Sequence, residues 1–424
     1  MNVSPVLALA GLITIGLLAT RLPRPQWRHV ASLDRVLVTG GPFVLLGLVL
    51  GPGIDLVSPP VLEALAPVTA LGIGWIGATL GARFEWRYLR RIPRGAWLLA
   101  ALASVAVFAA VALAAWLLTS VVPALATAWT PRRPAVLTLA AVAAASGPGA
   151  VARVARAMGI RKSVAHMLAL AATLETACGA LAMTVPLALH GPHPPGGSAV
   201  LGWLSWIVFA AASGTLVGLV FLALTRLRPA PADLAFALLA TLLCGAGIGY
   251  AAELSPFVVC ALATALIVNT SPARRAARRV LAEWEHPLYA ILLVVAGALL
   301  TLPTAGILVA VPLLAGVRAA ATWAAARYGR LALGLAGVPP HIGLGTIAQD
   351  GAAVALALNF FIIYGDPGGA VLTTIVLGVV TAQLMAPPLM ALALRAGSGG
   401  PAAPLTQPAQ RPELSANAPA EWLR

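Results

Sequence analysis

Runs of about 20 apolar residues recur along the chain, and no other feature limits its possible folds as strongly. A helix rises about 1.5 Å per residue, so a run of this length crosses the hydrocarbon core of a bilayer. Gly, Pro and Arg residues separate about thirteen such runs. The expected spans are 3–20, 35–53, 60–82, 95–121, 134–157, 163–189, 199–225, 231–252, 255–269, 286–302, 304–325, 340–364 and 369–394.

Composition agrees with an integral membrane protein. Hydrophobic residues make up 60% of the 424 residues and charged residues only 9%, against about 25% charged in soluble domains. We therefore expect a transmembrane domain over residues 1–395. The tail at 396–424 is rich in Pro, Ala and Ser and has no apolar face, so we expect it to be disordered and cytoplasmic.

The basic residues predict a topology. In short loops, Arg and Lys gather on the cytoplasmic side. With the N-terminus outside, nearly all loop arginines fall in inner loops, and only Arg132 and Arg133 fall in an outer loop. The net charge of +14 therefore reflects topology, and we do not expect nucleic acid as a partner.

Three charged residues lie deep inside the expected spans: Glu175, Arg318 and Asp350. Each costs about 2.5–3.5 kcal/mol to insert unless it is paired or lines a wet cavity. One acid and one base predict an ion pair between Glu175 and Arg318. The three cysteines have no metal-type spacing, and we expect neither a metal site nor a cofactor.

Two spans carry interruptions near their middles. AASGPGAV at 144–151 contains Ser146, Gly147 and Pro148, and GLGTIAQDGAAV at 343–354 contains Gln349 and Asp350. Each interruption falls in the middle helix of a triplet, and the two triplets enter the membrane from opposite sides. Paired interruptions in inverted repeats indicate a transporter site near the midplane.

Four segments, in this order, resemble monovalent cation:proton antiporters of the sodium/hydrogen exchanger type. They are LGIGWIGATLGARFEWRYLRR (71–91), SGPGAVARVARAMGIRKSV (146–164), HPLYAILLVVAGALL (286–300) and GVRAAATWAAARYG (316–329). The resemblance implies an all-α polytopic fold of about 13 transmembrane helices with two broken helices that cross. It also implies a homodimer in the lipid of the cell membrane, with the N-terminus outside and the C-terminus in the cytoplasm.

The chain departs from the family pattern at two places. Relatives usually carry Asp-Asp or Asn-Asp after the broken helix, and the second Asp binds the ion; an alignment without gaps puts Glu175 and Thr176 there. A shift of one residue puts Glu175 itself at the ion-binding position. Gly147 stands where relatives often have Asp or Ser.

These departures leave two roles open for Glu175: structural partner of Arg318, or the acid that carries the exchanged proton. Asp350 is expected to balance the N-terminal ends of the broken helices. The expected ligands for a hard cation are oxygens of Glu175, Thr176 and Asp350 and the carbonyls around Ser146 to Pro148.

The sequence therefore predicts exchange of Na⁺ or K⁺ for H⁺ by alternating access. The alternative is a family relative that lacks antiport and carries another solute or acts as a facilitator. We expect no enzyme, because Ser146 lies in ASGPG and not in a Gly-x-Ser-x-Gly elbow, and QDG at 349–351 lacks the form of an intramembrane aspartyl protease.

Overall fold

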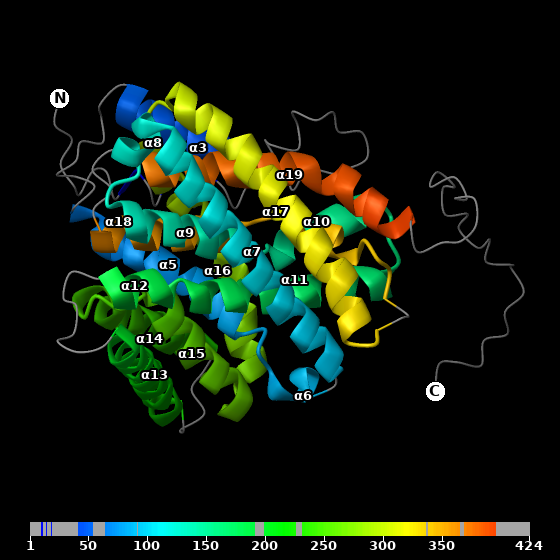
Figure 1. Ribbon diagram of the computed structural model, residues 1–424. Coiled ribbons are helices and arrows are strands. Elements are labelled where there is room, and N and C mark those ends of the chain that lie inside the picture. The colour runs from blue at the N-terminus through cyan, green and yellow to red at the C-terminus, as the bar shows by residue number, and fades with distance from the viewer. Residues whose placement is uncertain are drawn as a thin grey trace, which may run out of the picture.

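The fold consists of helices, and no strand occurs in the described part of the chain (Figure 1). The computed structural model describes residues 41–53, 64–90, 92–190, 199–225, 231–335, 338–364 and 369–395, together with Ala10, Gly11, Thr14 and Leu18. The expected span at 3–20 lies largely outside these residues, and the tail at 396–424 lies outside them entirely.

Every expected span after the first has a helix at its place. The first six helices are α3 (Gly41–Leu48), η2 (Val49–Gly53), α5 (Ala66–Gly81), α6 (Trp86–Leu89), α7 (Arg94–Val121) and α8 (Pro123–Ala128). The next six are α9 (Arg132–Ala144), α10 (Pro148–Ala157), α11 (Lys162–Ala182), α12 (Thr184–His190), α13 (Ala199–Leu224) and α14 (Pro231–Ala251). The last six are α15 (Pro256–Thr270), α16 (Arg274–Ala298), α17 (Ala305–Ala332), η3 (Ile342–Thr346), α18 (Gly351–Tyr364) and α19 (Ala370–Arg395).

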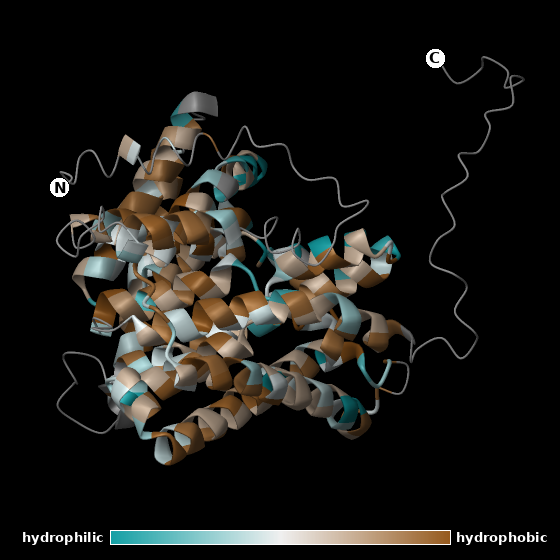
Figure 2. Ribbon diagram, turned by 90° about the horizontal axis from the view of Figure 1, so that it is seen from above, coloured by the Kyte–Doolittle hydropathy of each residue, from teal (hydrophilic) through white to brown (hydrophobic). Residues whose placement is uncertain are grey.

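Helix lengths fit a protein that crosses the membrane several times. Among the described residues, six helices are long and apolar enough to span a bilayer, or up to eight if each of two bent pairs counts as one span, and four shorter apolar helices accompany them. Figure 2 shows hydrophobic residues along most of the length of the helices. The long helices also expose large hydrophobic side chains, such as Val105 on α7, Phe209 on α13 and Phe236 on α14. Extended apolar surface of this kind is suited to contact with lipid.

One helix extends beyond its expected span. A span was expected to begin at 286, but α16 begins at Arg274 and includes the arginines assigned to an inner loop. Hydropathy locates only the apolar part of a helix, whereas Ala and Arg are strong helix formers that continue it into the polar zone. α17 likewise continues to Ala332, past the expected end at 325.

One group of helices surrounds α5. α14, α15 and α16 pack beside it, and α13 packs on α14 and α15. A buried apolar cluster of Trp75, Phe221, Leu238 and Cys260 lies among these helices. The backbones of α5 and α15 touch: a Cβ at Gly77 would lie 2.1 Å from the carbonyl oxygen of Phe257. Small residues permit such close approach where lipid supplies no hydrophobic force between helices.

A second group contains the two interrupted helices. α7 packs along α9, α11 and α17, α10 packs on α11, and α19 packs on α17 and η3. The bent pair α9–α10 turns by 40° at its break. α18 contacts α5 and α16 of the first group and α9 and α19 of the second, so the second broken helix joins the two groups.

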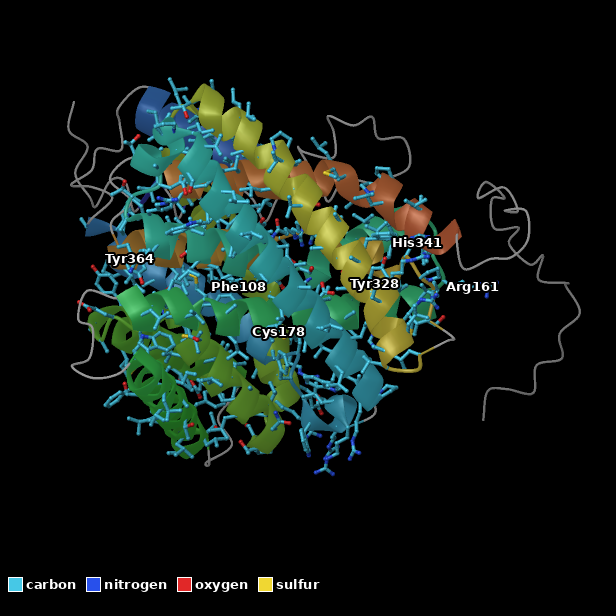
Figure 3. The ribbon with its side chains drawn as sticks, in the orientation of Figure 1. Phe108, Arg161, Cys178, Tyr328, His341 and Tyr364 are labelled. Carbon is cyan, nitrogen blue, oxygen red and sulfur yellow. The ribbon has the colours of Figure 1, made fainter. Side chains whose placement is uncertain are left out.

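The start of α11 and the end of α18 lie far apart along the bundle. Figure 3 places Arg161 and His341 toward one end and Tyr364 toward the other, with Phe108 and Cys178 between them. Arg161 belongs to a loop that the charge pattern assigns to the inner side, and this assignment stays a prediction.

The α5–α15 contact predicts opposite effects for two glycine substitutions. Gly77→Ala places a methyl group against the Phe257 carbonyl, and such overpacking destabilises by about 1–3 kcal/mol. Gly247→Ala on α14 is the matched control, because a Cβ there meets nothing within 4 Å, and Gly→Ala in a helix gains about 0.5–1 kcal/mol. Thermal unfolding of the purified protein in detergent measures both, and a melting temperature of Gly77→Ala at or above the wild-type value contradicts this account.

Candidate ion-binding site

The two helix breaks touch each other. The first break lies between Ala144, where α9 ends, and Pro148, where α10 begins. The amide of Gly147 in this break donates to the carbonyl of Ala348 in the second break at 2.7 Å. A Cβ at Gly147 would lie 2.5 Å from the amide nitrogen of Asp350 and 2.7 Å from its Cγ. Glycine at 147 is therefore a requirement of the crossing.

Arg318 of α17 binds the carbonyl ends of both broken helices. Its Nε donates to Ala143 at 2.7 Å and its Nη1 to Ile347 at 2.5 Å. Its Nη2 lies 3.3 Å from the carbonyl oxygen of Ala145. The last carbonyls of a helix have no partner within it and carry partial negative charge. One guanidinium therefore stabilises two helix C-termini at once.

Gln349 and Gln383 complete the hydrogen bonding of these ends. The Nε2 of Gln349 donates to the carbonyl of Val142 at 2.8 Å and to that of Ala145 at 3.1 Å. The side chain of Gln383 on α19 in turn donates to the backbone carbonyl of Gln349. The carbonyls at the breaks thus already accept from side chains, which leaves fewer of them for a cation than the sequence led us to expect.

Asp350 binds the opposite, N-terminal ends. Its Oδ2 accepts from the amide of Gly149 in the first turn of α10 at 3.1 Å, and its Oδ1 accepts from the amide of Ala352 in α18 at 3.2 Å. Free amides at helix N-termini favour a carboxylate. The structure thus places Asp350 where its expected partners are.

Glu175 does not form the expected direct ion pair with Arg318. Its two oxygens accept from the hydroxyls of Ser146 at 2.6 Å and Thr346 at 3.1 Å. The Nη2 of Arg318 lies 3.3 Å from the same Ser146 hydroxyl. The predicted pair is therefore replaced by a bridge through Ser146, because the break places this residue between acid and base while helix carbonyls engage the guanidinium.

Thr176 and Asp350 share a cavity that Glu175 does not line. The cavity has a volume of about 50 Å³, enough for a small number of water molecules. Thr176 Oγ1 lies 2.7 Å from the Ala172 carbonyl and also contacts the carbonyl of Ser146. Glu175 is 6% exposed and faces the hydroxyls instead. Neighbouring residues of α11 are thus directed to different surroundings.

The same cavity is lined by charged residues that sequence reasoning had not assigned to the site. They are Arg83 of the turn after α5, Arg153 of α10 and Glu285 of α16. Glu285 lies one residue before the expected start of its span, so it was taken as a loop residue. The longer α16 brings it to the cavity, and only a better prediction of where this helix begins identifies it.

A second cavity lies among other helices. It has a volume of about 60 Å³ and is lined mainly by apolar side chains of α7, α9, α17 and α19, together with Arg318 and Gln349. Gln349 and Asp350 are consecutive, yet they line different cavities. The crossing of the breaks therefore separates the two spaces.

The arrangement of helices is shared with solved structures. Two structures of the sodium proton antiporter MjNhaP1 from Methanocaldococcus jannaschii superpose with TM-scores of 0.67 and 0.64. The chain has the fold of a sodium proton antiporter. The matches cover 92% and 93% of this chain and 98% and 99% of the other, at 13% and 16% identity. No family model and no curated protein sequence matches.

The second break fills the space beside Gly147. The family pattern led us to expect an acid or Ser at this position of the first break, whereas Asp350 of the second break lies there. Its Oδ2 accepts from the amide of Gly149, so a side-chain oxygen is present beside the start of α10.

The close contact at Gly147 predicts that two substitutions do not compensate for each other. Gly147→Asp places a Cβ against the backbone of residues 349 and 350, and Asp350→Gly removes the acceptor for two amides, so each lowers the free energy of unfolding by about 1–3 kcal/mol. Because the contact at 147 is with backbone atoms, the double variant Gly147→Asp/Asp350→Gly stays less stable than Asp350→Gly alone. Thermal unfolding of the three variants in detergent measures this, and a double variant as stable as the wild type contradicts it.

Proposed function

We propose that the protein exchanges a monovalent cation, Na⁺ or K⁺, for H⁺ by alternating access. The observation that carries the proposal is the carboxylate of Asp350, which lines a cavity at the crossing of two broken helices and binds the helix ends there. The antiporter fold supports it, and the structural neighbours are described as sodium proton antiporters. Na⁺ is thus the better supported cation, and K⁺ remains part of the proposal.

Asp350 is our candidate for the acid that carries the exchanged proton. Each carboxylate oxygen has two lone pairs, and each oxygen of Asp350 accepts one backbone hydrogen bond. A lone pair on each oxygen is left for a proton or a cation, and Thr176 Oγ1 supplies a further oxygen at the cavity. Because the proton and the cation use the same oxygens, binding of one excludes the other.

This assignment moves the carrier role away from Glu175, the residue that the sequence favoured. Glu175 accepts two hydroxyl hydrogen bonds, one from each break. We propose that it fixes the breaks to each other and to α11. A carboxylate held in this way stabilises the crossing whether or not cargo is bound.

Two cavities that meet at one crossing are suited to alternating access. We propose that α5 and α13–α16 form one body and that α7, α9–α11, α17 and α19 form the other, with the triplets on either side of α7 and α17 as inverted repeats. A displacement of one body against the other would open one cavity as the other closes.

The proposal includes the expected setting in the membrane. We propose a homodimer in the cell membrane, with about 13 spans over residues 1–395, the N-terminus outside and the tail at 396–424 in the cytoplasm. The bias of arginine toward one set of loops supports this orientation.

Proteoliposomes with an internal pH dye test the exchange. An imposed Na⁺ or K⁺ gradient should change the internal pH, and Asp350→Asn should slow that change by about 100-fold or more, because the neutral amide cannot carry a proton. Glu283→Gln is the matched control, since Glu283 is an exposed α16 carboxylate outside the cavity, and it should keep the wild-type rate.

Three outcomes contradict parts of this assignment. Exchange by Asp350→Asn at the control rate removes Asp350 as the carrier. Loss of exchange in a folded Glu175→Gln variant returns that role to Glu175. Cation flux without any pH change indicates the facilitator and removes antiport.

A single carrier acid predicts electroneutral exchange. One proton for one cation moves no net charge, whereas each net charge moved is biased by about 2.3 kcal/mol per 100 mV. A valinomycin-clamped potential of either sign should therefore leave the equilibrium internal pH unchanged at a fixed Na⁺ gradient. A pH that shifts with the sign of the potential indicates a second titrating acid, for which Glu285 lies in the same cavity.

A further inference from the structure

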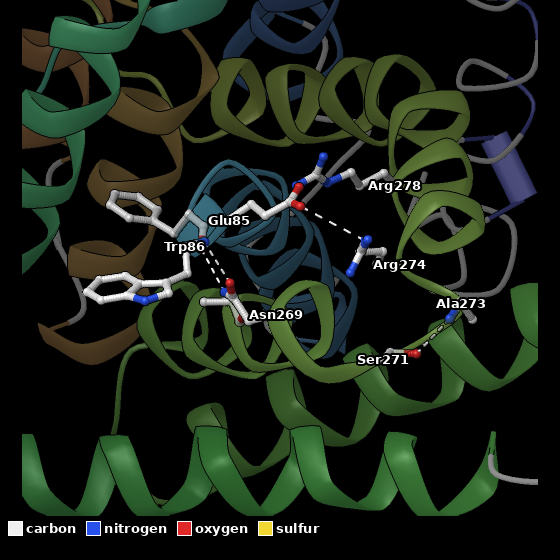
Figure 4. A network of polar contacts seen from close by, with 9 residues as sticks. Glu85, Trp86, Asn269, Ser271, Ala273, Arg274 and Arg278 are labelled. Atoms are coloured by element: carbon white, nitrogen blue, oxygen red, sulfur yellow. Dashed lines mark hydrogen bonds and ion pairs between the residues drawn. The ribbon is translucent and has the colours of Figure 1, made fainter. Parts of the chain in front are cut away.

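A second polar pocket lies far along the chain from the crossing residues, where the turn before α6 meets the end of α15 and the start of α16. Its volume is about 220 Å³, and its lining includes Glu85, Trp86, Arg87, Arg90, Asn269 and Arg274. Figure 4 shows Glu85, Trp86, Asn269 and Arg274 of this lining, together with Arg278. None of these residues lines the cavity that contains Asp350. The pocket is therefore a site separate from the proposed exchange.

Asn269 holds the wall of this pocket in place. Its Oδ1 accepts from the amide of Trp86 at 2.7 Å. Its Nδ2 donates to the carbonyls of Phe84 and Ala265, both at 2.7 Å. The turn between α5 and α6 is thus fixed to the last turn of α15, and the arginines that follow start from a defined backbone.

The pocket carries excess positive charge. Glu85 is 6% exposed and forms an ion pair with Arg278, and its other oxygen lies 3.9 Å from Arg274 Nε. This one carboxylate is thus shared by two guanidinium groups. Arg87 and Arg90 are exposed, and among the described residues neither has a carboxylate within ion-pair distance.

The start of α16 adds to that excess. Its first turn contains no acid, and its N-cap residue, Ala273, makes no side-chain capping hydrogen bond. Arg274, Arg275, Arg278 and Arg279 all lie in the first two turns. Positive side chains are unfavourable at the positive end of a helix dipole, and a bound anion relieves both charges.

Trp86 indicates where the anion comes from. Its side chain is 56% exposed, and the Arg90 guanidinium carbon lies 5.1 Å from its ring centroid. Tryptophan concentrates at the boundary between headgroups and hydrocarbon, and basic pockets between membrane helices bind anionic headgroups. A lipid can therefore place its phosphate against the arginines while its apolar part contacts the indole of Trp86.

We propose that this pocket binds the phosphate of an anionic phospholipid headgroup. Arg87, Arg90 and Arg274 face the phosphate, since Arg278 is already paired with Glu85. Trp86 lies at the level of the lipid glycerol. The site links α5, α15 and α16 through a ligand supplied by the membrane.

Lipid titration of the purified full-length protein tests the site. Native mass spectrometry should show tighter binding of phosphatidylglycerol than of phosphatidylcholine with the same chains. Arg87→Gln/Arg90→Gln should weaken phosphatidylglycerol binding by about 10-fold or more. The matched control, Arg156→Gln/Arg161→Gln, removes two exposed arginines that do not line the pocket, and it should bind as the wild type does.

Two results of the titration overturn the proposal. An equal loss in both double variants means that surface charge alone attracts the lipid. Full competition by inorganic phosphate at equal concentration means that the pocket takes the free ion. If the Gln variant does not fold, wild-type protein with a headgroup-photoreactive phosphatidylglycerol decides: label in residues 84–90 or 269–278 supports the site, and label confined to other segments overturns it.

Discussion

The hydrogen bonds from Arg318 to helix carbonyls are the contacts on which the centre of this protein depends. Two helices end inside an apolar bundle, and each end leaves carbonyls that water would otherwise solvate. A guanidinium has five donors in a fixed plane, so one side chain can reach Ala143 and Ile347 together. Lysine, a compact charge without this fork, is not equivalent. The breaks can therefore cross in the membrane only because α17 supplies this group.

The opposite helix ends follow from the same electrostatics. Asp350 accepts from amides of α10 and α18 and so joins two N-termini, as Arg318 joins two C-termini. Glu175 then binds a hydroxyl from each break. Arg318 and Asp350 thus each carry a charge opposite to the partial charge of the helix ends that they bind. The pattern also explains why three costly charged residues persist inside a bundle that contains so few.

Much of this arrangement follows from the sequence by simple rules. Apolar run length located the helices, and Gly147, Pro148 and the residues around Asp350 marked both breaks, because these residue types cannot continue a helix in lipid without replacement partners. Helix polarity predicted where Asp350 would bind. The ion pair of Glu175 with Arg318 was wrong, since opposite charge indicates attraction and not which acceptors are nearer. α16 begins before the expected span at 286–302, because hydropathy does not register a helix that continues into the polar zone, and Glu285 was missed for that reason.

The contact between Gly147 and Asp350 affects how relatives of this protein can be recognised. A linear motif that requires an acid or a hydroxyl at the first break excludes this chain, although an acid lies beside the same amides in space. A criterion based on position would ask for a carboxylate within hydrogen-bond distance of the first turn of α10. This chain meets that criterion, because Asp350 supplies the carboxylate from the second break. The two residues of this contact, Gly147 and Asp350, are separated by about half of the chain, so a motif within one segment cannot register it.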